Sequence, residues 1–240
     1  MEKHNKAVAE IAADVRAFYD RKEPFRISRG STNSTRSILL RQGNGVDISH
    51  LCHVLKVDTH ARTALVEPNV PMDRLVETTL KCGLIPPVVI ELPGITVGGG
   101  YAGTSGESSS FKHGFFNRTI NYVNMILANG GLVKALETER PDLFSGAAGA
   151  VGSLGIDTGV ELRLIQATKY VETTYHPVAS VPEATQELRQ FATNSDLDYL
   201  DGILVSLHQG LVIAGRMTND LQPNLPICSF TVCQRNTQTT

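Results

Sequence analysis

The apolar residues near the N-terminus recur every three to four positions, which is typical of an amphipathic helix. The residues at this spacing are Ala7, Ile11, Val15 and Phe18. They predict a helix over residues 3–20 that ends before Pro24. Comparable patterns predict three later helices, at residues 71–81, 141–148 and 181–192. In the first of these, Leu75 and Leu80 are expected to face inward.

Alternation of apolar and polar residues predicts strands, and short turns between several of them favour hairpins. The expected hairpins pair residues 53–58 with 63–67, 120–128 with 132–136, and 202–207 with 211–217. Single strands are expected at 25–28, 37–40, 160–166 and 170–175. This order lacks the repeating strand–helix–strand rhythm of a parallel doubly wound sheet, so we expect an α+β fold.

The composition indicates a folded protein without a preference for polyanions. Of 240 residues, 41% are apolar and 19% are charged, and the net charge is −2. Nucleic acid and anionic membrane surfaces are therefore not expected partners. The absence of a long apolar run and of a signal-peptide pattern predicts a cytoplasmic protein with no transmembrane segment. The four cysteines lack the paired spacing of a zinc site, so no metal is expected.

Three segments rich in glycine, serine and threonine separate these elements, at residues 29–36, 94–110 and 146–156. Glycine lets consecutive main-chain N–H groups turn toward a ligand, and such donor arrays suit phosphate. We therefore expect loops with free N–H groups that together bind an extended phosphate-bearing cofactor. Residues 98–103 also match G-x-G-x-x-G, but no amphipathic helix begins after them, which argues against a Rossmann site.

Together these segments resemble the flavin-binding part of Δ(24)-sterol reductases, within the FAD-linked oxidoreductases of the vanillyl-alcohol oxidase type. The resemblance is carried by RGSTNSTR (29–36), residues 66–100, GTSGESSSFKHG (103–114) and DLFSGAAGAVGSLGI (142–156), and it continues to about residue 220. It implies a PCMH-type fold in which two α+β subdomains hold FAD. The implied layout is an N-terminal helix (1–20), an FAD-binding domain (21–166), the start of a substrate or cap domain (167–220) and a tail (221–240).

The resemblance also implies that all three segments contact FAD: the first at the pyrophosphate, the second along the cofactor toward the isoalloxazine, and the third at its far side. The expected contact residues are Arg29, Gly30, Ser31, Thr32, Asn33, Ser34, Thr35, Thr96, Val97, Gly98, Gly99, Gly103, Thr104, Gly106, Ser108, Ser109, Ser110, Gly149, Gly152, Gly155 and Ile156.

Glu107 and His113 are the candidate catalytic residues. Glu107 is the only carboxylate of GTSGESSS and would handle a proton near the flavin or bind a hydroxyl; alternatively, it accepts local N–H bonds. His113 would donate to flavin or substrate, or it is a plain surface residue. Arg29 would pair with phosphate, or it is a solvated charge beside the loop.

The resemblance implies flavin hydride transfer on an apolar, terpenoid-like or polyketide-like alkene or alcohol. NADPH would supply the hydride for reduction, but no NADPH site is identified. Most of the relatives' cap is missing from this sequence, so we expect a shortened protein whose flavin face a homodimer would cover. Two alternatives remain open: a fold recruited for non-redox cyclisation or isomerisation in biosynthesis, with FAD structural or absent, and a non-catalytic binding protein.

The sequence also predicts that FAD is held non-covalently. Some relatives attach the flavin through a histidine in the first segment or a cysteine just before the second. This chain has no histidine in residues 29–36 and no cysteine in residues 83–100. Acid precipitation of the flavin-loaded protein should therefore release all flavin into the supernatant, as measured by its absorbance. Flavin retained in the washed pellet would contradict this.

Overall fold

The computed structural model describes residues 1–30, 44–221 and 226–228, and the expected strand at 37–40 lies outside them. The helices in these ranges are α1 (Glu2–Arg21), α2 (Met72–Leu80), α3 (Val97–Ala102), α4 (Ser110–His113), α5 (Pro141–Ala147), α6 (Val181–Phe191) and the 3-10 turn η1 (Phe116–Thr119). The strands are β1 (Arg26–Ser28), β2 (Gly45–Asp47), β3 (Val54–Asp58), β4 (Thr63–Val66), β5 (Leu84–Ile85), β6 (Ile120–Ile126), β7 (Leu132–Leu136), β8 (Ile156–Arg163), β9 (Ile165–Gln166), β10 (Tyr170–Val178), β11 (Tyr199–Ser206) and β12 (Gln209–Thr218). The α+β class is confirmed. The four helices predicted from apolar spacing are also confirmed, as α1, α2, α5 and α6.

The central sheet has five antiparallel strands in the order β3-β4-β8-β6-β7. The hairpins β3–β4 and β6–β7 form as the alternating pattern predicts. β8 lies between them and pairs with both β4 and β6. It begins at Ile156 and ends at Arg163, whereas a single strand over 160–166 was expected, so that boundary prediction is wrong. The last two residues of the expected strand form β9, which pairs with β5 instead.

A bulge in β8 explains why its pattern is hard to read. Gly159 pairs with Asn124 and Asp157 pairs with the next residue, Met125, so Thr158 is an extra residue on β8. An extra residue reverses the side to which the preceding side chains point. Ile156 therefore packs in a different apolar cluster from Val160.

The larger cluster fills the space between α2, α3 and one side of the central sheet. Leu75, Tyr101, Phe116 and Val160 are fully buried in it. Leu75 thus faces inward as expected, but Leu80 is 46% exposed at the last residue of α2, so that part of the prediction is wrong.

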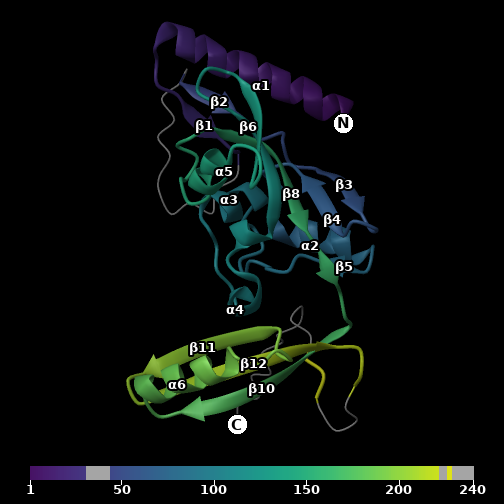
Figure 1. Cartoon of the computed structure of the whole chain (residues 1–240), viewed down its shortest axis with the longest axis vertical. Coiled ribbons are helices and arrows are strands. Elements are labelled where there is room, and N and C mark those ends of the chain that lie inside the picture. Colours follow the sequence, from purple (N-terminus) through teal and green to yellow (C-terminus); the bar gives the residue numbers. More distant parts are fainter. Residues whose placement is uncertain (31–43, 222–225, 229–240) are drawn as a thin grey trace, which may run out of the picture.

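The smaller cluster packs α1 against one end of the molecule. This end is formed by β1, β2, the end of β6 and the start of β8. Figure 1 shows α1 lying across this end, away from the C-terminal sheet. Ile11 and Val15 on α1 are buried against residues that include Val46, Ile126 and Ile156. Each such side chain contributes about 1.5–3 kcal/mol when fully buried, so this face holds the helix in place.

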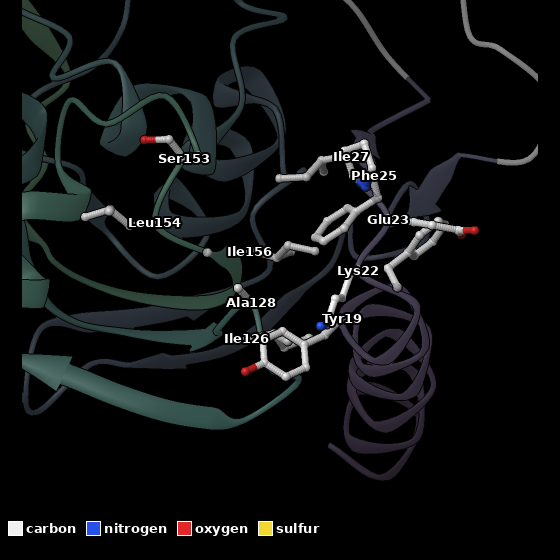
Figure 2. Close-up of a pocket in the computed structure, with 14 residues that line it drawn as sticks. Tyr19, Lys22, Glu23, Phe25, Ile27, Ile126, Ala128, Ser153, Leu154 and Ile156 are labelled. Carbon is white, nitrogen blue, oxygen red and sulfur yellow. The ribbon is translucent and has the colours of Figure 1, made fainter.

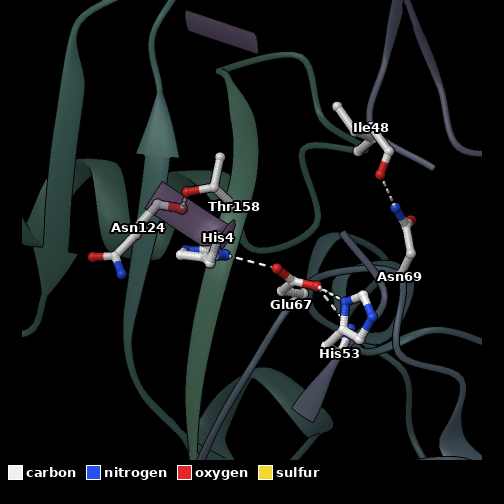
Figure 3. Close-up of polar contacts among 7 residues, drawn as sticks. All are labelled: His4, Ile48, His53, Glu67, Asn69, Asn124 and Thr158. Atoms are coloured by element: carbon white, nitrogen blue, oxygen red, sulfur yellow. Dashed lines mark hydrogen bonds and ion pairs between the residues drawn. The ribbon is translucent and has the colours of Figure 1, made fainter. Parts of the chain in front are cut away.

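A buried carboxylate adds a polar contact to the α1 interface (Figure 3). Glu67 follows β4 and is 2% exposed. Its Oε1 lies 2.8 Å from His4 Nδ1 on α1, and its Oε2 accepts a 2.7 Å hydrogen bond from the main-chain N–H of His53 and lies 2.9 Å from His53 Nδ1. Burial acts to raise the pKa of Glu67, but the hydrogen bonds from His4 and His53 outweigh it and lower the pKa.

The C-terminal part is a separate antiparallel sheet in the order β10-β12-β11, with α6 packed on one face around Val178, Ala184 and Val212. It lies next to α4 (Figure 1). There, Lys112 Nζ lies 2.8 Å from Asp198 Oδ1 and donates to the carbonyls of Ser195 and Leu197, while Leu200 N–H donates to the carbonyl of Ser108. These bonds fix the start of β11 against the second glycine-rich segment. None of the helices described is long and apolar enough to span a membrane.

We predict that Glu67→Gln lowers the free energy of unfolding by about 1–3 kcal/mol at neutral pH, because it removes a hydrogen-bonded buried charge. A carboxylate with a lowered folded pKa stabilises above its unfolded pKa, and that stability is lost as the pH falls through the folded pKa. The difference from wild type should therefore shrink below about pH 4.

Urea unfolding between pH 3 and 7 measures this difference. Glu77→Gln, at an exposed position on α2, is the matched control and should change stability little. A Glu67→Gln loss that is the same at pH 3 as at pH 7 would refute the role given to the ionised carboxylate.

Candidate cofactor-binding site

A cavity of about 630 Å³ opens between the end of α1 and the turn that leads into β8. Its lining residues are Phe18, Tyr19, Lys22, Glu23, Pro24, Phe25, Ile27, Ile126, Ala128, Gly152, Ser153, Leu154, Gly155 and Ile156. Phe25, Ile27 and Ile156 lie around the same space in Figure 2, from opposite sides. An apolar cavity of this size with a few polar groups at its rim suits one end of a nucleotide-sized ligand.

The third glycine-rich segment forms the wall of this cavity on the β8 side. Gly149 and Gly152 have φ of 81° and 77°, and Val151 between them has φ of 54°. The turn contacts the second segment, because Val151 N–H donates to the carbonyl of Ala102 at 3.2 Å and a Cβ on Gly149 would lie 3.4 Å from Thr104 Cγ2. Three of the four expected contact residues of this segment, Gly152, Gly155 and Ile156, line the cavity.

The second segment differs from the expected open loop, because its first half is helical. Thr96 caps α3, and its Oγ1 accepts from the N–H of Gly99 at 3.2 Å. Val97, Gly98 and Gly100 donate their N–H groups to the carbonyls of Val70, Pro68 and Thr96. The expectation of a free N–H array is therefore wrong for residues 97–100, because the chain itself satisfies these donors.

The glycines of α3 serve close packing. A Cβ on Gly98 would lie 2.8 Å from Pro68 Cβ, and one on Gly100 would lie 2.5 Å from Ile90 Cδ1. These distances are too short for any larger residue without movement. The three consecutive glycines thus allow α3 to pack directly against Pro68, which follows β4.

The second half of the segment, residues 103–110, is irregular up to the start of α4. Thr104 has φ of 48°, and the N–H of Glu107 donates to Ser110 Oγ at 2.8 Å. Gly106 must be small because a Cβ there would lie 2.9 Å from the Phe115 ring. Gly103 similarly packs near the carbonyl of Gly99, and Ser109 is buried before α4. Residues 103–110 therefore lie between α3 and the start of β11.

The two candidate catalytic residues lie at this junction with the C-terminal sheet. Glu107 Oε1 accepts from the main-chain N–H of Glu91 at 3.1 Å, and burial raises the pKa of Glu107. Burial likewise lowers the pKa of His113, assisted by the neighbouring Lys112 charge. Both shifts favour the neutral form of each side chain. The hydrogen bond from Glu91 agrees with the alternative role of Glu107, which is to accept local N–H bonds. It leaves the second carboxyl oxygen for other contacts.

The first segment is described only at its start. Gly30 has φ of 70°, and a Cβ there would lie 2.6 Å from Ser49 Cβ, so this position requires glycine. Arg29 precedes it. The other expected contacts, Ser31, Thr32, Asn33, Ser34 and Thr35, lie outside the described residues.

Two features of the site were not expected from the sequence. The first is the cluster of Phe18, Phe25 and Ile27, which lines the cavity although it precedes the first glycine-rich segment. The second is Asp157, a carboxylate one residue beyond the third segment. Burial raises the pKa of Asp157 to about 7, against the lowering effect of Arg29. A carboxylate directly after Ile156, at the end of the third segment, is the sequence signal that identifies it.

The mixed helix and sheet fold, with the second and third small-residue segments in contact beside a cavity, is consistent with a domain that binds a nucleotide cofactor. A model of the FAD binding domain family matches residues 5–136, more than half of the chain. The chain therefore belongs to this family of PCMH-type FAD-binding domains, and the resemblance seen in the sequence is confirmed.

The chain is also similar to proteins named as sterol reductases and as a cytokinin dehydrogenase. The chain is 33% identical over 175 residues to Delta(24)-sterol reductase of Mus musculus. This match covers 73% of this chain and 34% of that protein. It is 39% identical over 134 residues to the enzyme of that name from Pisum sativum, covering 55% and 24%. Cytokinin dehydrogenase 10 of Oryza sativa subsp. japonica is 26% identical over 215 residues, covering 81% and 38%. The chain thus spans between 24% and 38% of the length of these relatives.

We predict that Gly98→Ala lowers the free energy of unfolding by about 1–3 kcal/mol, because its methyl group meets the rigid ring of Pro68. Gly99→Ala is the matched control on the same helix, since the nearest atom to its new Cβ is Thr96 Oγ1, at 3.2 Å, and no ring or backbone atom lies closer. Alanine there should be neutral or slightly stabilising through its helix propensity. Urea unfolding compares the two variants, and equal losses would contradict the packing explanation.

Proposed function

We propose that this chain binds FAD non-covalently and provides the flavin-binding part of an oxidoreductase that acts on an apolar alkene or alcohol. The observation that carries this proposal is the cavity beside the third glycine-rich segment, in a chain of the FAD binding domain family. The names of the sterol reductase relatives support an apolar substrate.

The residues of the site fit FAD in three respects. The apolar wall formed by Phe25, Ile27 and Ile156 suits the flat face of the adenine. Arg29, beside the tight turn at Gly30, supplies a positive charge for the pyrophosphate. Residues 103–110, at the junction with β11, are then the segment nearest the isoalloxazine.

When bound, FAD supplies the ability to accept or donate a hydride. The chain's own contribution is to exclude water and to hold protons near the ring. Burial raises the pKa of Glu107 and lowers that of His113, which would ease proton transfer by either side chain near the flavin. NADPH as the electron donor stays a prediction from the resemblance.

The expected homodimer also stays a prediction. The C-terminal sheet offers an apolar surface for it on the face that α6 does not cover, where Tyr175 and Ile203 are 61% and 50% exposed. A second copy packed there would shield these side chains from water.

FAD should stabilise the protein and quench its own fluorescence on binding. At about 100 times the dissociation constant it should add about 2.7 kcal/mol to the free energy of unfolding. Ala128→Trp places a large ring in the cavity from an exposed position on its rim, so FAD affinity should fall at least tenfold while the fold survives.

Leu132→Trp is the matched control, because Leu132 is 59% exposed and lies outside the cavity. Its FAD affinity should equal that of the wild type in a fluorescence titration. No thermal shift with FAD in the wild type would overturn the proposal. Equal FAD affinities for Ala128→Trp and Leu132→Trp would instead refute the placement of the cofactor.

A further inference from the structure

Glu67 is buried and Asp157 is half-buried with a buried Oδ1 atom, but the surroundings of the two carboxyl groups differ. Glu67 is bonded by two histidines and a main-chain N–H. In Asp157, Oδ1 is buried and has no hydrogen-bond partner among the described residues. A buried polar atom without a partner costs about 1–3 kcal/mol, so its presence calls for an explanation such as a ligand.

The bulge at Thr158 determines where Asp157 points. Because the extra residue reverses the alternation, Ile156 packs toward α1 and Asp157 lies on the side of Tyr101, whose pKa its charge raises. The Tyr101 hydroxyl does not satisfy Asp157, since it donates to the carbonyl of Phe144 at 2.8 Å.

Asp157 therefore lies where the three glycine-rich segments meet. It follows Gly155 of the third segment, it faces Tyr101 on the helix of the second, and its charge interacts with Arg29 at the start of the first. Among the residues described, Arg29 is the charged group that acts on the pKa of Asp157, and the charge of Asp157 in turn raises the pKa of Tyr101. Within the described residues, Asp157 forms no direct ion pair with Arg29. A negative charge on the carboxyl would therefore lack a paired positive charge there.

An ionised carboxylate at this place would repel the pyrophosphate of FAD. A neutral carboxyl has one O–H donor, and a phosphate oxygen accepts such a bond. Burial already raises the pKa of Asp157 to about 7, and the added negative charge of a phosphate would favour the neutral form further.

We propose, on the basis of the function proposed above, that Asp157 is a further FAD-binding residue whose neutral carboxyl donates a hydrogen bond to a pyrophosphate oxygen, so that FAD binding takes up a proton. Binding then raises the proton affinity of this group. The affinity for FAD is constant well below the pKa of the free protein and falls as the pH rises above it. The limiting slope is about tenfold per pH unit for one linked proton.

FAD itself is the probe, titrated into the wild-type protein between pH 6 and 8.5 with flavin fluorescence as the readout. We expect the dissociation constant to be nearly flat up to about pH 7 and to rise severalfold to tenfold by pH 8.5. Calorimetry at pH 8 in two buffers of different ionisation enthalpy should give an uptake approaching one proton per FAD. These measurements need no variant, so they stand even if a substitution disturbs folding.

Asp157→Asn keeps an N–H donor in place of the O–H and cannot ionise. It should bind FAD about as tightly as the wild type at pH 6, and with an affinity that does not change up to pH 8.5. Glu77→Gln is the control, because it also removes one carboxylate but lies at an exposed position on α2 outside the cavity, so it should keep the wild-type pH dependence.

Each outcome decides one of the two proposals. If the wild type binds no FAD at any pH, the proposed function fails. If it binds FAD with a pH-independent affinity and no proton uptake, only the role of Asp157 fails. The same conclusion follows if Asp157→Asn keeps the wild-type pH dependence, or if it loses FAD affinity equally at every pH.

Discussion

The bulge at Thr158 is the constraint on which the arrangement of the molecule depends. β8 is the one strand that pairs with both hairpins of the central sheet, so it runs through the whole domain. Without the extra residue, its apolar side chains would all point to one side. With it, Ile156 joins the cluster under α1 while Val160 joins the cluster under α2 and α3. One strand thereby belongs to both cores, and the cavity opens beside the smaller core under α1.

The same geometry explains the chemistry of the site. At the bulge, β8 changes the side to which its side chains point, and Asp157 directly precedes the extra residue Thr158. The cavity lies on the α1 side of the strand, whereas Asp157 lies on the side of Tyr101. In the proposed site, an extended FAD would pass Asp157, whose pKa is raised by burial against the lowering effect of Arg29. The bulge in β8 thus connects the geometry of the strand to the protonation state of Asp157.

Much of the fold could be predicted from the sequence, because α1, α6 and the three hairpins have regular apolar spacing over many residues. The start of β8 could not, since the bulge breaks the alternation that a strand prediction uses. α3 was also hidden, because its glycines have poor helix propensity. A side-chain cap from Thr96 and the contact of Gly98 with Pro68 stabilise it instead. For the site, the glycine segments were recognisable by composition, whereas Phe18 and Phe25 reach the cavity only through tertiary packing.

The burial of His4 has a consequence for how the protein is handled. Its side chain contacts Glu67 only three residues after Met1, so one buried side chain already fixes the first turn of α1 to the rest of the molecule. A purification tag or fusion partner joined directly before Met1 would begin beside that buried carboxylate and compete with the seating of the helix. A spacer of several polar residues would separate the two, and attachment at the other end of the chain would leave the α1 interface untouched.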